Sequence, residues 1–200
     1  MWWKFGLQIL PVLFMAGFVL GLSYVITPSL DSPVLMISFT AVTVLFFIAM
    51  LTFREQYGWN LGLLLGFSAA LGGLLSVLAT GRGQVVGYEP IWLVLGCLAA
   101  GAVAGLWMGS RFGEFGAILW LVSWAYLLGW AALIFLQLDA VFYLTWSVVG
   151  LALFTGLAAV WFSHMRDQLE KRSSVSAAVD LYLICINLYL AGMILLSVDI

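Results

Sequence analysis

The chain has 200 residues, of which 65% are hydrophobic and 8% are charged, and its formal net charge is −2 at pH 7. Soluble domains average about 45–50% apolar and about 25% charged residues, so a soluble enzyme, a nucleic-acid-binding protein and a disordered regulator are all excluded. The two cysteines, Cys97 and Cys185, lie in apolar stretches and do not indicate a disulfide framework. The composition therefore predicts an all-α polytopic membrane protein.

Seven apolar stretches are long enough to cross a hydrocarbon core, which takes about 20 residues per helix. They are residues 5–26, 33–53, 59–80, 90–109, 114–136, 140–163 and 176–198. We interpret the first as a span rather than a signal peptide, because it is longer than a typical signal segment and no small-residue cleavage site follows it. The segments between the stretches are short, so we expect a single seven-helix transmembrane domain over residues 1–200.

The distribution of Lys and Arg predicts the orientation of this bundle. With seven spans, six of these cations fall on one side and Arg82 alone falls on the other; the six are Lys4, Arg54, Arg111, Arg166, Lys171 and Arg172. Because cytoplasmic loops of membrane proteins are enriched in Lys and Arg, we expect a cytoplasmic N-terminus and a C-terminus outside.

This orientation has a direct test. Reporter fusions made after Arg172 and after Ile200 should give opposite compartment signals, because one span separates the two positions. The same signal from both fusions would remove a helix from the predicted topology.

Small residues at four-residue spacing predict close helix packing. The fourth stretch carries Cys97, Gly101, Gly105 and Gly109 on one face, the first carries Gly17 and Gly21, and the third carries Gly62 and Gly66. In lipid, helices associate through close backbone approach at such residues. We expect the row in the fourth stretch to pack inside the bundle, with an exposed dimer seam as the alternative.

Few residues are candidates for chemistry. His164 is the only histidine, so a haem held by two histidines and a zinc site with several converging ligands are both excluded within this chain. Ser68 lies too deep in its span to meet His164 as a nucleophile, and Trp120 and Trp124 are interpreted as a packing or lipid-facing stripe. We expect no catalytic residue, no metal and no cofactor.

Asp180 and Asn187 form the one candidate intramembrane polar site. Asp180 lies about 6 Å inside the seventh stretch, and Asn187 follows two helical turns later on the same face. Polar groups inside a membrane face the bundle and are functional candidates by default. Two interpretations stay open: interhelical hydrogen bonds that hold the seventh span, or part of a proton or cation path.

Three segments carry a family resemblance: VDLYLICINLY at 179–189, NLGLLLGFSAALGGL at 60–74 and RFGEFGAIL at 111–119. They resemble the last-helix signature, an apolar segment with a Gly-Phe pair, and the link into the fifth helix of the Bax-inhibitor family, the transmembrane BAX inhibitor motif proteins. The chain is identified as a divergent, bacterial-type member. The resemblance implies seven spans, an inside N-terminus and a place in the bacterial inner (plasma) membrane.

The chain departs from the family at the residues to which the resemblance attributes ion conduction. The resemblance implies that ion-leak members share a proton between two aspartates of the sixth and seventh helices, which gates a pH-sensitive calcium leak. Here the seventh-helix position is Ile184, and the sixth-helix position falls near Ala159 or Val160. We therefore expect a non-catalytic modulator or accessory subunit whose partners are membrane lipids and another integral membrane protein, not nucleic acid. The alternative is a proton- or cation-leak channel that uses Asp180 and Asn187.

Overall fold

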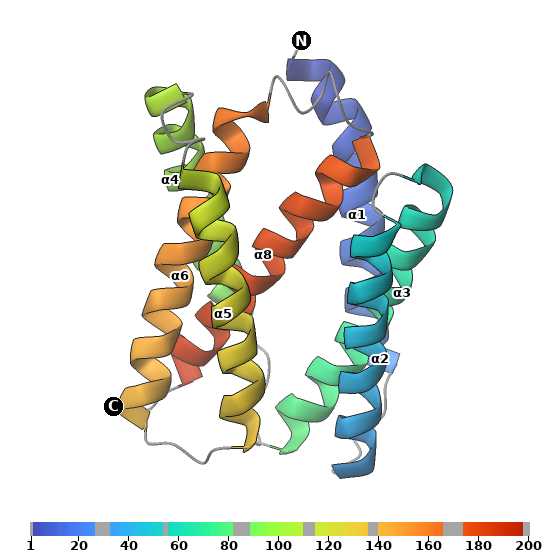
Figure 1. The fold of residues 1–200 in the computed structure, drawn as a ribbon. Helices are drawn as coiled ribbons and strands as arrows, with labels where there is room; N and C mark the ends of the chain where they lie inside the picture. The colour runs from blue at the N-terminus through green and yellow to red at the C-terminus, as the bar shows by residue number, and fades with distance from the viewer. Residues whose placement is uncertain are drawn as a thin grey trace. The chain divides into compact units, whose positions relative to one another are not determined.

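A computed structural model describes residues 2–26, 33–53, 56–81, 89–109, 115–135, 140–165 and 174–197. These residues form seven helices and no strand (Figure 1). The helices are α1 (Trp2–Ile26), α2 (Pro33–Thr52), α3 (Tyr57–Gly81), α4 (Glu89–Met108), α5 (Gly116–Phe135), α6 (Ala140–Ser163) and α8 (Ser174–Ser197). The predicted all-α fold class is confirmed, and the largest difference in bounds is that α1 begins at Trp2 instead of Phe5.

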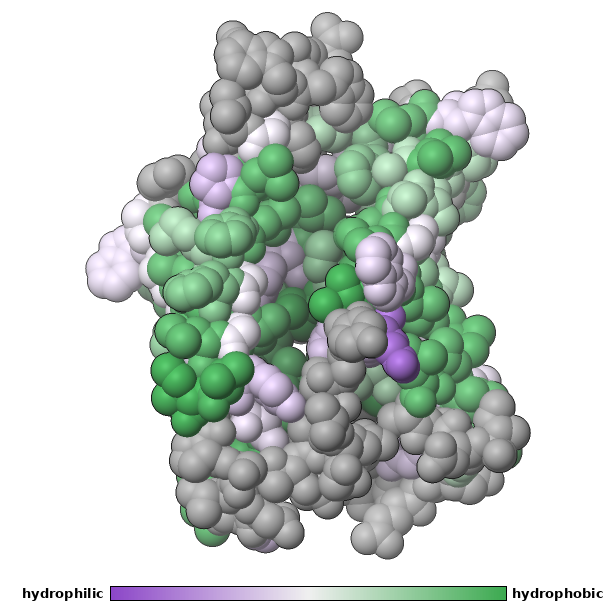
Figure 2. Space-filling view, turned by 180° about the vertical axis from the view of Figure 1, so that it is seen from behind, coloured by the Kyte–Doolittle hydropathy of each residue, from purple (hydrophilic) through white to green (hydrophobic). Residues whose placement is uncertain are grey.

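Six of these helices are long and apolar enough to cross a membrane among the described residues, and α5 contributes the shorter apolar stretch Gly116–Gly129. Large apolar side chains cover much of the described surface, as Figure 2 shows from behind; Phe14 is 75% exposed and Trp107 is 87% exposed. Exposing so much apolar surface to water is unfavourable, whereas the hydrocarbon of a lipid bilayer accommodates it. The chain is therefore an integral membrane protein with a polytopic helical bundle.

Several Ser and Thr hydroxyl groups inside the spans donate hydrogen bonds within their own helices. The hydroxyls of Thr40 and Thr43 donate to the carbonyl oxygens of Met36 and Phe39, each at 2.7 Å. The Ser68 hydroxyl donates to the carbonyl oxygen of Leu64 at 2.7 Å. In a medium without water a polar group needs an internal partner, and these bonds to the preceding turn supply one.

The described contacts divide the chain into two compact units. The first unit comprises Met1–Val86 and Leu169–Asp180, and the second comprises Gly87–Gln168 and Leu181–Ile200. Helix α8 is shared, because its residues up to Asp180 belong to the first unit and its later residues to the second. That a single domain spans residues 1–200 stays a prediction.

In the first unit α3 packs against both α1 and α2. A Cβ atom placed on Gly72 would lie 2.5 Å from the carbonyl oxygen of Leu20 in α1. On the α2 side, Gly66 lies under the ring of Phe46 and Gly73 under the ring of Phe39. Of the α3 span 61% is buried, against 17% in α1 and 11% in α2, so α3 is the core helix of this unit.

In the second unit α6 packs against both α4 and α5. Between α5 and α6, the rings of Tyr126 and Trp146 stack with centroids 5.0 Å apart, and Phe154 meets Tyr126 edge-on at 5.6 Å. Gly129 and Gly150 leave the room that these rings occupy, since a Cβ on either would overlap Trp146 or Tyr126. Aromatic pairs of this geometry stabilise a contact beyond their area, so they fix the α5–α6 pair.

Candidate functional site

Asp180 is a buried carboxyl-bearing residue on a membrane-spanning helix. It lies six residues after the start of α8, roughly 9 Å along the axis, and is 5% exposed. Its preceding neighbours on the helix, Ser176 to Val179, are each at most 1% exposed. Burial of a carboxyl group within a membrane-spanning helix is costly, so the position is a functional candidate rather than a surface residue.

Asn187 has a different environment from Asp180. Its side chain is half-buried, and its Nδ2 donates to the carbonyl oxygen of Leu183 at 2.8 Å, one turn earlier in α8. The two residues are seven positions apart, which is about 10 Å along the axis and beyond direct hydrogen bonding. By contacts Asp180 belongs to the first unit and Asn187 to the second. Their joint role as an intramembrane site stays a proposal.

The positions at which the resemblance implies paired aspartates are apolar and buried in the second unit. Ile184 is 4% exposed, Ala159 is 2% exposed and Val160 is 8% exposed. In the described part of the chain no group of three His, Cys, Asp or Glu residues could hold a metal ion. Two further acids near the ends of predicted spans, Glu114 and Asp139, lie outside the described residues. Calcium takes six to eight oxygen ligands. The side chains of Ile184, Ala159 and Val160 carry no oxygen atom and cannot supply any of them.

The row of small residues predicted in the fourth stretch meets α6 at Gly101 and Gly105. A Cβ on Gly101 would lie 2.8 Å from the Cβ of Ala158, and a Cβ on Gly105 would overlap the carbonyl oxygen of Ala159. Cys97 is a half-buried free thiol. Gly109 follows the end of α4 with a φ of +56° and open space around it, so it acts as a left-handed helix terminator instead of a packing residue.

The glycine pairs of the first and third stretches do not all pack against another helix, as their spacing predicted. Nothing lies within 4 Å of a Cβ placed on Gly17, Gly21 or Gly62, whereas Gly66 is covered by Phe46. The physical reason is that a small-residue pair only creates room, and a second element must bring a side chain or backbone into it.

The structure also gives the surroundings of the other residues that the sequence analysis singled out. His164 directly follows α6, half-buried, with its Nδ1 at 3.2 Å from both the Ser163 hydroxyl and the Val160 carbonyl oxygen. Cys185, like Cys97, is a free half-buried cysteine. Trp124 is 38% exposed. The side chains of all seven Lys and Arg residues lie outside the described side chains, so the orientation stays a prediction.

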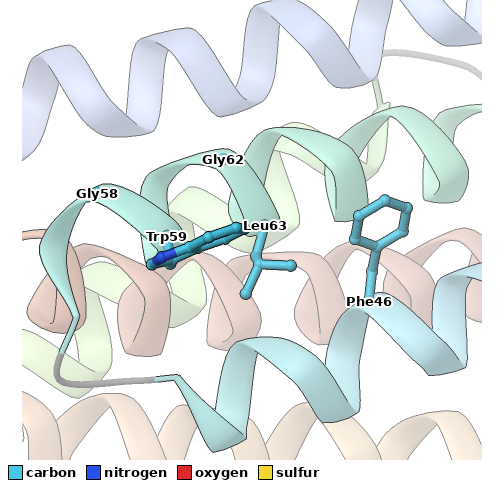
Figure 3. A pocket seen from close by; sticks show the side chains of 5 residues that line it. All are labelled: Phe46, Gly58, Trp59, Gly62 and Leu63. Carbon is cyan, nitrogen blue, oxygen red and sulfur yellow. The ribbon is translucent and has the colours of Figure 1, made fainter.

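Sequence reasoning missed a groove in the first unit. It lies between the second half of α2 and the first turns of α3 and is lined by Phe46, Gly58, Trp59, Gly62 and Leu63 (Figure 3). The sequence signal that could have found it is a tryptophan flanked by glycines four residues apart at the start of a span.

The sequence profile of the family described as "Inhibitor of apoptosis-promoting Bax1" matches residues 1–198. Comparisons with curated proteins and with solved structures gave no match. The family match covers all seven described helices, including the α8 segment and the α3 segment on which the resemblance was based. The chain therefore belongs to the Bax-inhibitor family.

Proposed function

We propose that this chain is a non-catalytic modulator or accessory subunit of another integral membrane protein in the bacterial inner (plasma) membrane. The observation that carries the proposal is the burial of Ile184, Ala159 and Val160 at the positions where the resemblance implies paired aspartates. Two close carboxylates can share a proton and switch near neutral pH, whereas an isoleucine and an alanine cannot ionise. A family fold without its proton-sharing pair is better suited to binding than to conducting.

The proposed contacts are between helices within the bilayer. Helices α1 and α2 are 17% and 11% buried over their spans, which leaves broad apolar faces on the first unit. Helix association in lipid depends on such faces and on small residues within them.

Purification in mild detergent tests the accessory role. The full-length chain should carry one integral membrane protein in stoichiometric amount, identified by mass spectrometry, because a subunit interface survives conditions that preserve lipid contacts. A multi-span protein of similar size, expressed and purified identically, is the control. If the chain brings down only what the control brings down, the accessory role is wrong.

Calcium flux separates this proposal from the alternative of a leak. Purified protein in liposomes should show no calcium leak above empty liposomes between about pH 6 and pH 8, because a single aspartate supplies at most two of the oxygens that calcium needs. The variant Ile184→Asp should stay silent, since its partner near Ala159 is also apolar. The double variant Ile184→Asp with Ala159→Asp is the informative comparison, as it restores both acids.

The leak alternative rests on one observation, the burial of Asp180 in a spanning helix. A pH-dependent calcium flux from the native chain that Asp180→Asn abolishes would contradict the accessory role and support a conduction path through Asp180.

A further inference from the structure

We propose that the groove between α2 and α3 is a binding site for one acyl chain of a membrane phospholipid. The groove has a volume of about 460 Å³, within the usual range of sites that hold small molecules. Its described lining residues all belong to the first unit. The inference is independent of the accessory role, because it concerns lipid rather than a protein partner.

Two glycines create the groove. Gly58 and Gly62 are one helical turn apart on α3, both are exposed, and nothing lies within 4 Å of a Cβ placed on either. The next member of the same row is Gly66, where the ring of Phe46 from α2 lies 2.5 Å from such a Cβ. The groove is therefore open at the start of α3 and closed by Phe46 one turn deeper.

The lining has a polar end and an apolar end. Figure 3 shows the Trp59 indole lying along the groove with its nitrogen at the end away from Phe46. The other described side chains of the lining are those of Phe46 and Leu63, and both are apolar. Trp59 is 70% exposed and packs near Phe53 with centroids 6.4 Å apart.

The polar and apolar ends of the groove match the expected depth of its residues in the membrane. The apolar spans of α2 and α3 are Pro33–Thr52 and Gly58–Val77, so Trp59 lies at the edge of the hydrocarbon and Phe46 roughly 9 Å inside it. Tryptophan favours the interface because its ring is apolar and its N–H can donate to headgroup or ester oxygens. An acyl chain entering beside Trp59 and ending against Phe46 matches both ends of the groove.

The geometry favours an acyl chain over a partner helix. A helix that packs on a glycine row needs the row to stay open over successive turns, since a helix is about 10 Å wide with its side chains. Here the open part is one turn long, because Phe46 fills the position over Gly66. A thin, flexible chain fits a notch of that length, whereas a helix would meet the Phe46 ring.

Photo-crosslinking tests the site on the full-length protein. The protein is reconstituted in phosphatidylcholine vesicles containing a small fraction of phosphatidylcholine with a diazirine in one acyl chain, and lipid adducts are counted by peptide mass spectrometry. Adducts should concentrate on residues 57–66 and saturate with the labelled lipid. Gly62→Leu should reduce them about tenfold, since displacing two buried methylene groups already costs that much affinity.

Gly21→Leu is the matched control, because Gly21 is also an exposed helical glycine of the first unit with nothing within 4 Å of its Cβ position. It should leave the adducts on residues 57–66 unchanged. Saturation in the native chain tests the site even if a variant fails to fold. Adducts that rise in proportion to labelled lipid and match those on α1 would overturn the proposal, as would labelling that survives Gly62→Leu. A protein–protein crosslink at the groove that Gly62→Leu removes would also overturn it and assign the groove to a partner helix.

Discussion

Gly105→Leu should destroy the contact between α4 and α6 and lower the thermal midpoint in detergent by roughly 10 °C or leave little folded protein. A Cβ at this position would overlap the carbonyl oxygen of Ala159 and lie 3.0 Å from its carbonyl carbon. The obstacle is backbone, which cannot rotate away as a flexible side chain would. The two helices would have to move apart along the face that they share, and packing energy would be lost along its length.

Gly96→Leu is the control on the same helix. Gly96 is exposed and nothing lies within 4 Å of a Cβ placed on it, so the leucine does not collide with a neighbouring backbone as it would at Gly105. Because leucine favours a helix over glycine by nearly 1 kcal/mol, the control should leave the midpoint unchanged or raise it slightly. An equal loss in Gly105→Leu and Gly96→Leu would mean that general helix perturbation, not the α6 contact, causes the effect.

Gly72→Leu should have a comparable effect in the first unit. A Cβ on Gly72 would lie 2.5 Å from the carbonyl oxygen of Leu20 and 2.7 Å from the Cβ of Ser23, both on α1. Two rigid groups stand in the same place, so α1 must shift away from α3 to admit a side chain. Overpacking of this kind costs about 1–3 kcal/mol even where neighbours can adjust, and we expect the upper end here.

The measurement is the thermal midpoint in detergent together with the yield of monodisperse protein. Gly21→Leu serves as the control because Gly21 adjoins Leu20 on α1 but faces open space. It should retain the native midpoint within about 2 °C, as most surface substitutions do. A native-like midpoint for Gly72→Leu would show that α1 does not pack on Gly72 in the folded protein.

The helices themselves were predictable because each is specified by local chemistry. A run of about 20 apolar residues has one stable backbone conformation in hydrocarbon, and the polar segments between runs mark its ends. Pro33 begins α2 as expected, and α6 has the bounds Ala140 and Ser163 that the sequence analysis predicted. The family resemblance was also available from sequence, because the α8 segment around Tyr182 and Asn187 keeps most of its signature.

The candidate site was predictable only in part. The resemblance implies that Ile184, and a position near Ala159 or Val160, stand where ion-leak members carry aspartates, and this inference rests on residue identity alone. The distinction between Asp180, which is buried, and Asn187, whose amide bonds to its own helix, depends on what surrounds each side chain. From helical spacing alone, Asp180 and Asn187 are predicted to share one helical face and one role.

The glycines show where prediction from sequence ends and why. Gly17 with Gly21 and Gly101 with Gly105 have the same four-residue spacing, yet the first pair faces open space and the second lies against α6. The spacing determines that a helix can be approached closely, whereas the approaching atoms belong to residues distant in sequence, such as Ala159 for Gly105 and Phe46 for Gly66. Residue order specified the helices and the places where they can touch. Only the packed arrangement decided which of those places is filled by another part of the chain and which, as at Gly58 and Gly62 beside Trp59, stays open.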